Sequence, residues 1–212
     1  QRIRQMTVTH GATPLKYAAR RVEVGIVITP SAWYAHEGVL ALRGLNVRPG
    51  SIDLSEPVYI TEEGHRLHRK SALYVGDVVV VRTGQAGAAA AVPADLDGCN
   101  CIDLVIVRPA AGLLPKFLEF VLNSDWTQKH VDKYSVGTIQ SHFNVGAMKE
   151  VPIPLPPLEA QARLVRELTE VSEHALAMTR RLSRQMALLQ EHRQALITAA
   201  VTGDLDVPGM AA

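Results

Sequence analysis

Several features that would assign this sequence to a common class are absent or scarce. No apolar run approaches the roughly 18 uninterrupted residues that a membrane-spanning helix needs. The polar stretch 1–10 lacks the apolar segment of a secretory signal. Hydrophobic residues make up 47% of the 212-residue chain and charged residues 20%, which excludes wholesale disorder. We therefore expect a soluble, cytoplasmic protein of one large domain, or one domain with an appendage.

Cysteine is also scarce, and this limits disulfide and metal chemistry. The two cysteines, Cys99 and Cys101, are separated by one residue. This spacing is too short for an easy disulfide, and two thiols are too few for a zinc site, which takes four ligands. His65 and His68 stand three positions apart among basic residues and lack a third ligand. We expect two partly buried thiols on a strand and no bound metal.

The sequence contains none of the common catalytic motifs. There is no Walker loop, no His-Glu-x-x-His and no Gly-x-Ser-x-Gly. A DNA methyltransferase would need an acidic or amide residue before a Pro-Pro-aromatic run, whereas Pro156 and Pro157 are followed by Leu158. We therefore expect a chain that is not an enzyme and binds no cofactor directly.

The balance of charge restricts the ways in which the chain could bind nucleic acid. Lys and Arg number 22 against 21 Asp and Glu, so the net charge is +1. Freestanding nucleic-acid binders are usually far more basic. If this protein binds DNA, it needs specific contacts, a second copy or a helper subunit.

The composition changes character near residue 151. Before that point, short strand-like runs alternate with Gly, Pro and Asn, and they fall at Val22 to Ile28, Val39 to Leu42, Val58 to Ile60, Val78 to Val81 and Ile102 to Val107. Two helices are expected among them, one beginning at Pro115 and one over Trp126 to Tyr134 with Asp125 as its cap. The pattern predicts an α+β fold, with residues 1–150 as a strand-rich globular domain.

The remainder of the chain is predicted to be a connector, one long helix and a tail. The prolines of residues 151–157 prevent helix formation there. Leu158 to Val201 then contains no Gly or Pro, and a helix of that length would extend about 65 Å. Gly203 stands where a C-terminal cap belongs, so the helix is expected over 158–203 and the tail over 204–212.

The predicted helix carries a heptad-like apolar stripe, which is typical of a coiled coil. The stripe, called the seam below, comprises Leu164, Leu168, Val171, Ala175, Met178, Leu182, Gln185, Leu189, His192, Leu196 and Ala199. Gln185 and His192 would cost stability and fix the register. The stripe needs a partner helix, unless it folds back on its own globular domain.

Polar side chains of the types that contact DNA gather on predicted loops. Arg82 follows a buried strand, where its guanidinium could meet a guanine edge or a phosphate, or pair with Asp77 or Asp103. Thr83, Gln85, Arg43 and Asn46 are further candidates for reading bases. Arg66, Arg69 and Lys70 suit phosphates, although a solvated loop is equally ordinary. A polar loop adds Thr138, Gln140, Ser141 and His142.

Two sets of motifs resemble a known family. Near the long helix stand Ile153-Pro-Leu-Pro-Pro-Leu-Glu-Ala-Gln161 and Leu188-Leu-Gln-Glu-His-Arg-Gln-Ala-Leu-Ile-Thr-Ala-Ala-Val-Thr-Gly-Asp204. They resemble the conserved region of the DNA specificity subunits of Type I restriction-modification systems. The runs beginning at Val39, Gly76, Pro115 and Gly137 resemble the target recognition domain of that family, in the right order. One departure is Ala160, where the family commonly carries Glu.

The resemblance implies a division of labour between subunits. The globular domain would read one half of a split double-stranded DNA target, and the helix would set the distance to the other half. Methylation and cleavage would belong to partners: a methyltransferase subunit that binds S-adenosylmethionine, with a nuclease subunit left open. Family members carry two such domains and two such helices, so this chain resembles half a subunit. We expect an antiparallel homodimer, or one arm of a longer subunit.

Two other functions remain open from the sequence. The chain could be a coiled-coil interaction module whose globular domain binds protein and no DNA. It could also be a diverged nuclease, in which Asp95 and Asp97 would have to bind Mg²⁺.

Overall fold

The structure is a computed structural model that describes residues 2–135 and 143–203, with side chains described up to residue 131 in the first range. The chain divides into two compact units, Gln1–Val165 (unit 1) and Arg166–Ala212 (unit 2). Unit 1 extends beyond the expected boundary at residue 150 and includes the proline-rich segment 151–157. The mixed α and β content agrees with the predicted fold class.

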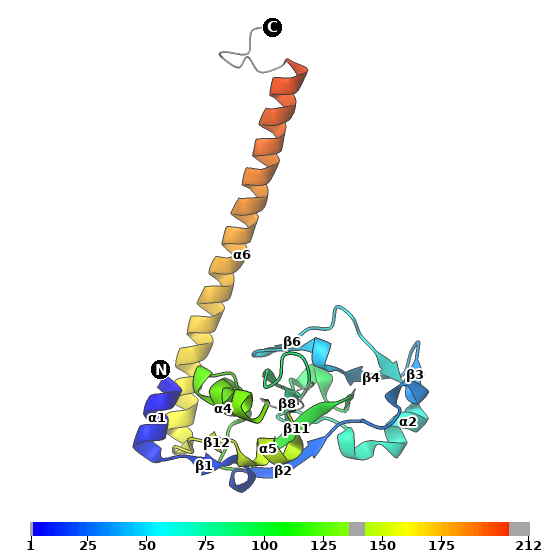
Figure 1. Ribbon diagram of the computed structural model, residues 1–212, viewed down its shortest axis with the longest axis vertical. Helices are drawn as coiled ribbons and strands as arrows, with labels where there is room; N and C mark the ends of the chain where they lie inside the picture. The colour runs from blue at the N-terminus through cyan, green and yellow to red at the C-terminus, as the bar shows by residue number, and fades with distance from the viewer. Residues whose placement is uncertain (1, 136–142, 204–212) are drawn as a thin grey trace. The chain divides into compact units, whose positions relative to one another are not determined.

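The larger sheet of unit 1 is antiparallel throughout. Its order is β2 (Ala19–Val24), β11 (Leu104–Pro109), β8 (Val78–Val81) and β9 (Ala89–Ala91) (Figure 1). The four valines of β8 are all buried. Such a continuous apolar run is typical of a strand covered on both faces. β8 therefore forms a rigid base for the residues that follow it.

A second four-stranded sheet packs into the same core. Its order is β10 (Asn100–Cys101), β4 (Val39–Leu42), β7 (Tyr59–Ile60) and β3 (Tyr34–Ala35), and only the β10–β4 pair is parallel. Leu42 and Cys101 share a buried cluster with Val79 and Ile106 of the larger sheet. Two short pairs complete the strands, β5 (Val47–Arg48) with β6 (Ser51–Ile52) and β1 (Thr13–Pro14) with β12 (Pro152–Ile153).

Short helices occupy the connections of unit 1. The α-helices are α1 (Arg2–His10), α2 (Glu62–Leu67), α3 (Pro115–Leu122), α4 (Asp125–Ser135) and α5 (Val145–Glu150). The 3₁₀ turns are η1 (Leu15–Tyr17), η2 (Pro30–Trp33), η3 (Gly44–Asn46), η4 (Arg69–Ser71) and η5 (Ala94–Leu96). The predicted cap of α4 was wrong by one residue. Asp125 is the first helical residue, and the Oγ atom of Ser124 accepts a hydrogen bond from the Thr127 amide at 3.4 Å.

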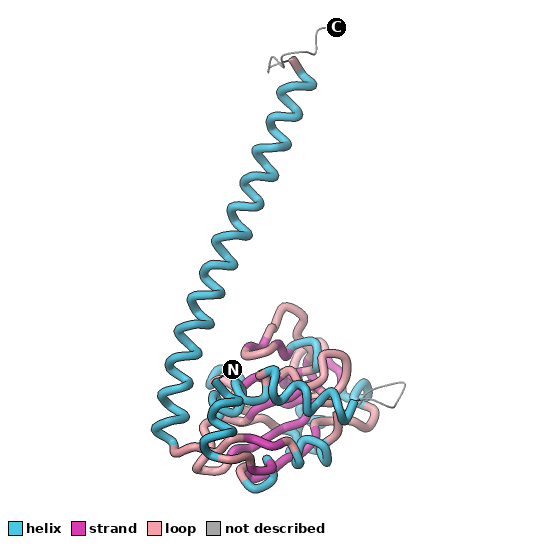
Figure 2. Tube along the Cα trace, turned by 60° about the vertical axis from the view of Figure 1, so that its left-hand side comes forward, coloured by secondary structure: helices cyan, strands magenta, loops and turns pink. Residues whose placement is uncertain are grey.

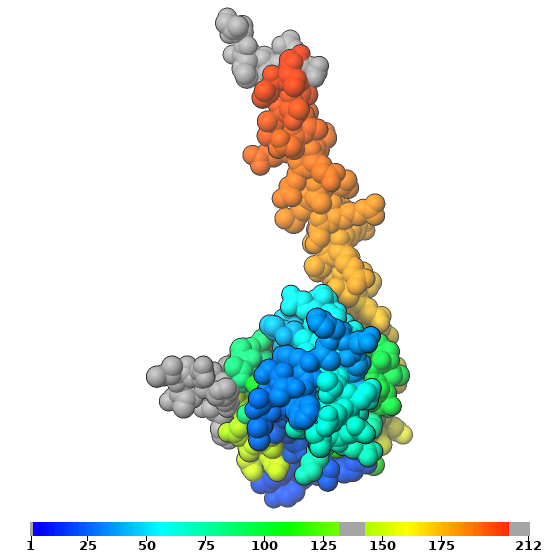
Figure 3. All heavy atoms as spheres, turned by 90° about the vertical axis from the view of Figure 1, so that its right-hand side faces the viewer, coloured from blue at the N-terminus to red at the C-terminus, as the bar shows by residue number. Residues whose placement is uncertain are grey.

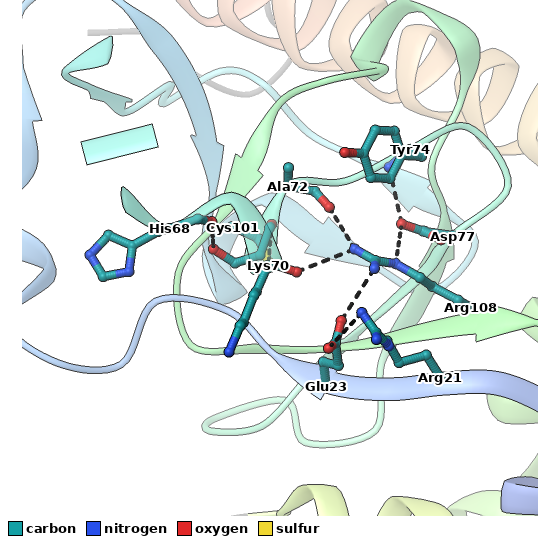
Figure 4. Close-up of polar contacts among 10 residues, drawn as sticks. Arg21, Glu23, His68, Lys70, Ala72, Tyr74, Asp77, Cys101 and Arg108 are labelled. Carbon is teal, nitrogen blue, oxygen red and sulfur yellow. Dashed lines mark hydrogen bonds and ion pairs between the residues drawn. The ribbon is translucent and has the colours of Figure 1, made fainter. Parts of the chain in front are cut away.

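A charged cluster around Arg108 joins distant parts of unit 1 (Figure 4). The guanidinium of Arg108 contacts Glu23 at 3.2 Å and Asp77 at 3.3 Å, and donates to the carbonyls of Ala72 and Lys70. Burial raises the pKa of Asp77, against the lowering effects of the Tyr74 amide and Arg108. The charges are paired within the cluster, so it acts as an internal brace.

The proline-rich segment is part of unit 1. Val151 and Ile153 are fully buried, and β12 pairs with β1 near the beginning of the chain. The connector expected at 151–157 therefore has a strand at its centre, because extended proline geometry suits a short strand with few ladder hydrogen bonds.

One long helix, α6 (Leu158–Thr202), follows, as the sequence predicts, and Figure 2 shows it uninterrupted. Gly203 has a φ of 81°, the left-handed conformation of a helix-ending glycine. Leu164 lies in unit 1 and is buried there, so its assignment to the seam was wrong, because it is covered within its own chain. Most seam residues of unit 2 are exposed, among them Val171, Met178, Leu182, Leu189 and Leu196.

Candidate nucleic-acid interface

A tight turn between β8 and β9 carries three of the predicted contact residues. The Val81 amide donates to the Ala88 carbonyl, and the Gly87 amide donates to the Val81 carbonyl, each at 2.9 Å. Gly84 and Gly87 have φ angles of 84° and 86°, which favour glycine. The turn therefore presents Arg82, Thr83 and Gln85 from the end of a buried strand.

A hollow of 270 Å³ brings this turn next to two other loops. Thr83 and Gln85 line it from the turn, Arg43 lines it from the loop after β4, Arg48 lines it from β5, and Asp103 lines it from the segment before β11. The hollow thus collects two cations, a hydroxyl, an amide and a carboxylate. These are groups that donate to and accept from base edges and phosphates.

Arg82 supports the hollow indirectly, through an ion pair with one of the residues that line it. Its side chain is 17% exposed and forms an ion pair with Asp103, whose side chain is 44% exposed. Asp103 has a φ of 52°, which is unusual for a residue other than glycine, although Asp tolerates it better than most. Of the partners that the sequence left open for Arg82, the structure contains the pair with Asp103. Within this pair, the Asp103 carboxylate is therefore the more accessible charge, and it is the member that lines the hollow.

Arg43 and Asn46 have different roles despite their proximity in sequence. The Asn46 residue is 2% exposed, and its amide accepts from the Arg43 backbone and donates to the carbonyls of Asp53 and Glu56. The structure thus gives the Asn46 amide a role within its own loop, and its burial does not favour the predicted contact with DNA. Asn46 instead fixes the loop that delivers Arg43, whose guanidinium makes one long hydrogen bond of 3.4 Å to the Glu56 carbonyl.

The basic residues Arg66, Arg69 and Lys70 are exposed on α2 and η4. Residues of this part of the chain, coloured teal, belong to the surface of unit 1 seen in Figure 3. Figure 4 shows the Lys70 side chain extending away from Arg108, which uses only the Lys70 carbonyl. These residues do not line the hollow that contains Arg43 and Gln85.

Some of the predicted contacts are not covered by the structure, and two residues that line the hollow were not among the predicted contacts. Thr138, Gln140, Ser141 and His142 lie outside the described residues. Arg48 and Asp103 line the hollow but were not predicted as contacts. Arg48 lies two positions after Asn46, the last predicted contact of this loop. Extending the predicted stretch by two residues would have included it. Asp103 carries no comparable local signal.

Among the described residues, no group of three or more His, Cys, Asp or Glu side chains is placed to hold a metal ion. No helix within the described ranges combines the length and hydropathy of a membrane span. Cys99 and Cys101 are free thiols, and burial raises the pKa of Cys99 to about 12 and that of Cys101 well above its ordinary value.

These observations define a class of architecture. It is a strand-rich unit with a polar hollow, followed in the chain by a long helix. Residues 68–186, more than half of the chain, match the model of the Type I restriction modification DNA specificity domain. The chain belongs to this family.

The curated relative described next is distant from this chain in sequence identity. The chain is 22% identical over 170 residues to the type I restriction enzyme EcoBI specificity subunit of Escherichia coli, an alignment that covers 80% of this chain and 36% of that protein. The chain therefore spans about a third of the length of this curated relative.

Solved structures share the fold. One comes from work on the complex assembly and conformational transition of the type I R-M system. It matches with a TM-score of 0.71 and 20% identity, covering 92% of this chain and 46% of that one. The crystal structure of the HsdS subunit from Thermoanaerobacter tengcongensis matches with a TM-score of 0.60 and 21% identity, covering 95% and 50%. In both cases the matched region is about half of the solved chain.

Proposed function

We propose that this chain reads one half of a bipartite DNA target as a specificity subunit of a Type I restriction-modification system. The observation that carries the proposal is the hollow between the β8–β9 turn and the loop after β4, in a chain of this family. It contains guanidinium, amide, hydroxyl and carboxylate groups on a rigid base, the combination that direct readout of base edges requires.

The residues divide into base contacts and phosphate contacts in this proposal. Arg43, Thr83 and Gln85 face the bases, together with Arg48 and Asp103. Arg82 acts indirectly, because it holds the Asp103 carboxylate. Arg66, Arg69 and Lys70 contact phosphates, which position a protein on the duplex without reading sequence. Thr138, Gln140, Ser141 and His142 remain proposed contacts outside the described residues.

The other proposed partners follow from the family and from unit 2. Catalysis belongs to a methyltransferase subunit, which binds S-adenosylmethionine, and a nuclease subunit is a further candidate partner. The exposed apolar seam of α6 supports an antiparallel pairing with a second copy of this chain. The complex would act on DNA in the cytoplasm.

The test is a selection of random DNA duplexes by the intact chain at low salt. We expect enrichment of one short sequence, arranged as an inverted repeat if the chain pairs with itself. Replacing Arg43 with Ala should weaken binding to the enriched duplex by about 10- to 100-fold, because one bidentate base contact is worth about 1–3 kcal/mol. Arg4→Ala, which removes an exposed arginine from α1, is the matched control and should bind normally.

The salt dependence separates this function from a protein-only interaction module. Phosphate contacts make log Kd depend steeply on log salt, with a slope of about 0.9 per contact. A chain that enriches no sequence and shows no such slope would contradict DNA reading. Affinity for a protein partner that is independent of salt would then favour the interaction module.

A further inference from the structure

The free edge of the larger sheet is covered by side chains of the α3–α4 segment. β9 ends the sheet, with β8 on one side only. Alternate residues of β9 bond to β8, which leaves the backbone groups of Ala89 and Ala91 facing outward, and the Gly87 carbonyl in the turn before the strand also faces this side. An uncovered edge of this kind would be open to pairing with another chain.

Three side chains take up these outward groups in order along the strand. A carboxylate oxygen of Glu119 accepts from the Ala91 amide at 2.9 Å. The Asn123 amide accepts from the Ala89 amide at 3.0 Å and donates to the Ala89 carbonyl at 2.8 Å.

The third side chain reaches the turn at the end of β9. The Gln128 amide donates to the Gly87 carbonyl at 3.0 Å. Glu119, Asn123 and Gln128 thus form a side-chain ladder along this edge, and the Gly50 amide adds a backbone hydrogen bond of 2.9 Å to the Ala89 carbonyl.

The spacing of helix and strand explains the start of this ladder. Glu119 and Asn123 are four residues apart at the end of α3, a rise of about 6 Å. Ala91 and Ala89 are two residues apart on a strand, a rise of about 6.8 Å. The spacing of Glu119 and Asn123 along the helix therefore matches the spacing of Ala91 and Ala89 along the strand. The interruption of helix between α3 and α4 then places Gln128 at the third position of the ladder.

Gln128 differs from the other two because it contacts the turn itself. Its amide also donates to the Leu122 carbonyl at 2.8 Å, which ties the turn to the end of α3. A Cβ atom at Gly87 would lie 2.8 Å from Oε1 and 2.9 Å from Nε2 of Gln128, so this amide lies directly against the glycine. The turn that carries Thr83 and Gln85 thus has an anchor outside its own sheet.

We propose that Gln128 is a positioning residue for sequence readout. It contacts no DNA in this proposal and holds the β8–β9 turn in the orientation in which Thr83 and Gln85 meet the bases. The inference rests on the proposed DNA function and deepens it. Loss of the Gln128 hydrogen bonds should loosen the turn, lower the affinity for the correct sequence and leave phosphate contacts unchanged.

The experiment compares Gln128→Met, which keeps the length of the side chain and removes its donor, with Gln5→Met at an exposed position of α1. Binding is measured to the duplex selected by the unchanged chain and to a scrambled duplex, at one salt concentration. We expect the ratio of the two affinities to fall about 10-fold in Gln128→Met, because the turn loses the two hydrogen bonds that the Gln128 amide donates to the Gly87 and Leu122 carbonyls. Binding to the scrambled duplex and the salt slope should stay unchanged, as should all values for Gln5→Met.

Hydrogen exchange on the same variants supplies a readout that needs no DNA. In Gln128→Met, the amides of the turn should exchange faster, while those of β11 keep their protection. An unchanged affinity ratio, or an equal loss on both duplexes, would overturn the inference.

The experiment also gives a definite interpretation to two further outcomes. If Gln128→Met does not fold, Gln128→Glu tests the same contact, because a carboxylate of the same length cannot donate to the Gly87 and Leu122 carbonyls, and it must lower the ratio too. If the unchanged chain selects no duplex at all, the proposed function fails as well, and the inference fails with it. The two failures are thus distinguishable.

Discussion

Arg82 follows the buried strand β8, and its guanidinium pairs with Asp103, 21 positions further along the chain. The Nε atom of Arg82 is buried without a hydrogen bond, so most of the compensation for this buried cation comes from one carboxylate. The left-handed backbone of Asp103 directs that carboxylate toward both the arginine and the hollow. At this scale a single ion pair links the stability of the fold to the chemistry of the candidate site.

Replacing Asp103 with Asn tests the stabilising part of this role. Asn tolerates the same backbone conformation but carries no charge, so the effect of the ion pair is isolated. We expect the free energy of unfolding to fall by about 1 kcal/mol, a value that reflects the exposure of Asp103. Urea denaturation measures it, with Asp95→Asn as the control at an exposed carboxylate. Equal stability of Asp103→Asn and the unchanged chain would show that the pair contributes nothing.

At the scale of elements, the anchoring of α6 depends on Gln161. This residue is fully buried in unit 1. Its side chain accepts from the Leu114 amide at 2.9 Å and donates to the carbonyls of Gly112 and Pro156 at 2.8 Å. The glutamine therefore fixes the first turns of the helix to the segment before α3 and to the proline-rich strand segment. This gives a physical role to the last residue of the Pro-Pro-Leu-Glu-Ala-Gln motif.

Gln161→Ala should lower the free energy of unfolding of unit 1 by about 2–3 kcal/mol. Three backbone groups would lose a buried partner at once, and each unsatisfied group is costly. Thermal or urea unfolding followed by tryptophan fluorescence measures the loss, since both tryptophans, Trp33 and Trp126, lie in unit 1. Gln190→Ala, an exposed position in unit 2, is the control and should unfold like the unchanged chain. A matching curve for Gln161→Ala would refute the anchoring role.

Elements with strong local patterns could be predicted, and those formed by long-range pairing could not. The bounds of β4 and β8 and the first residue of α3 agree with the sequence, because apolar runs and an initial proline are local signals. Helix α1 was missed because its polar residues show no clear periodicity. The two-residue strands β1 and β12 exist only because distant segments meet.

The candidate site follows the same division. Arg43, Thr83 and Gln85 could be proposed from their place beside strands, and they do line one hollow. Asp103 could be proposed only as one of two possible partners of Arg82, because its place in the hollow depends on that long-range ion pair and on its own backbone angle. Asn46 has the same residue type as many base-reading side chains, and only its burial reveals a structural role.

At the scale of the whole molecule, the exposed apolar surface of α6 is the feature that calls for a partner. In unit 2, Leu182, Leu189 and Leu196 are exposed at heptad spacing. A long helix with such a stripe gains stability mainly from packing against another helix. Exposed leucines also occur off the seam, at Leu176 and Leu188. The distribution alone therefore does not distinguish a paired seam from general hydrophobicity, and a positional test is needed.

Adjacent leucines on α6 provide this test. Leu189 lies on the seam and is 68% exposed, whereas Leu188 lies off it and is 56% exposed. The two positions are about 100° apart around the helix, so a partner that packs on the seam contacts one of them and not the other. If the proposed homodimer forms, light scattering of the chain should give about 46 kDa, twice the 23.0 kDa of one copy. Leu189→Asp should shift the mass toward 23.0 kDa, while Leu188→Asp should leave the dimer intact.

Each result of this comparison has a separate structural meaning. Equal dissociation by the two substitutions would indicate a partner that covers the helix broadly and would contradict a heptad seam. A chain that stays at 23.0 kDa over the whole concentration range would contradict the homodimer. The seam would then require a different helix, such as the second helical region of a longer specificity subunit. In that case two different half-targets, in place of an inverted repeat, would be read, because the two recognition domains would no longer be related by two-fold symmetry.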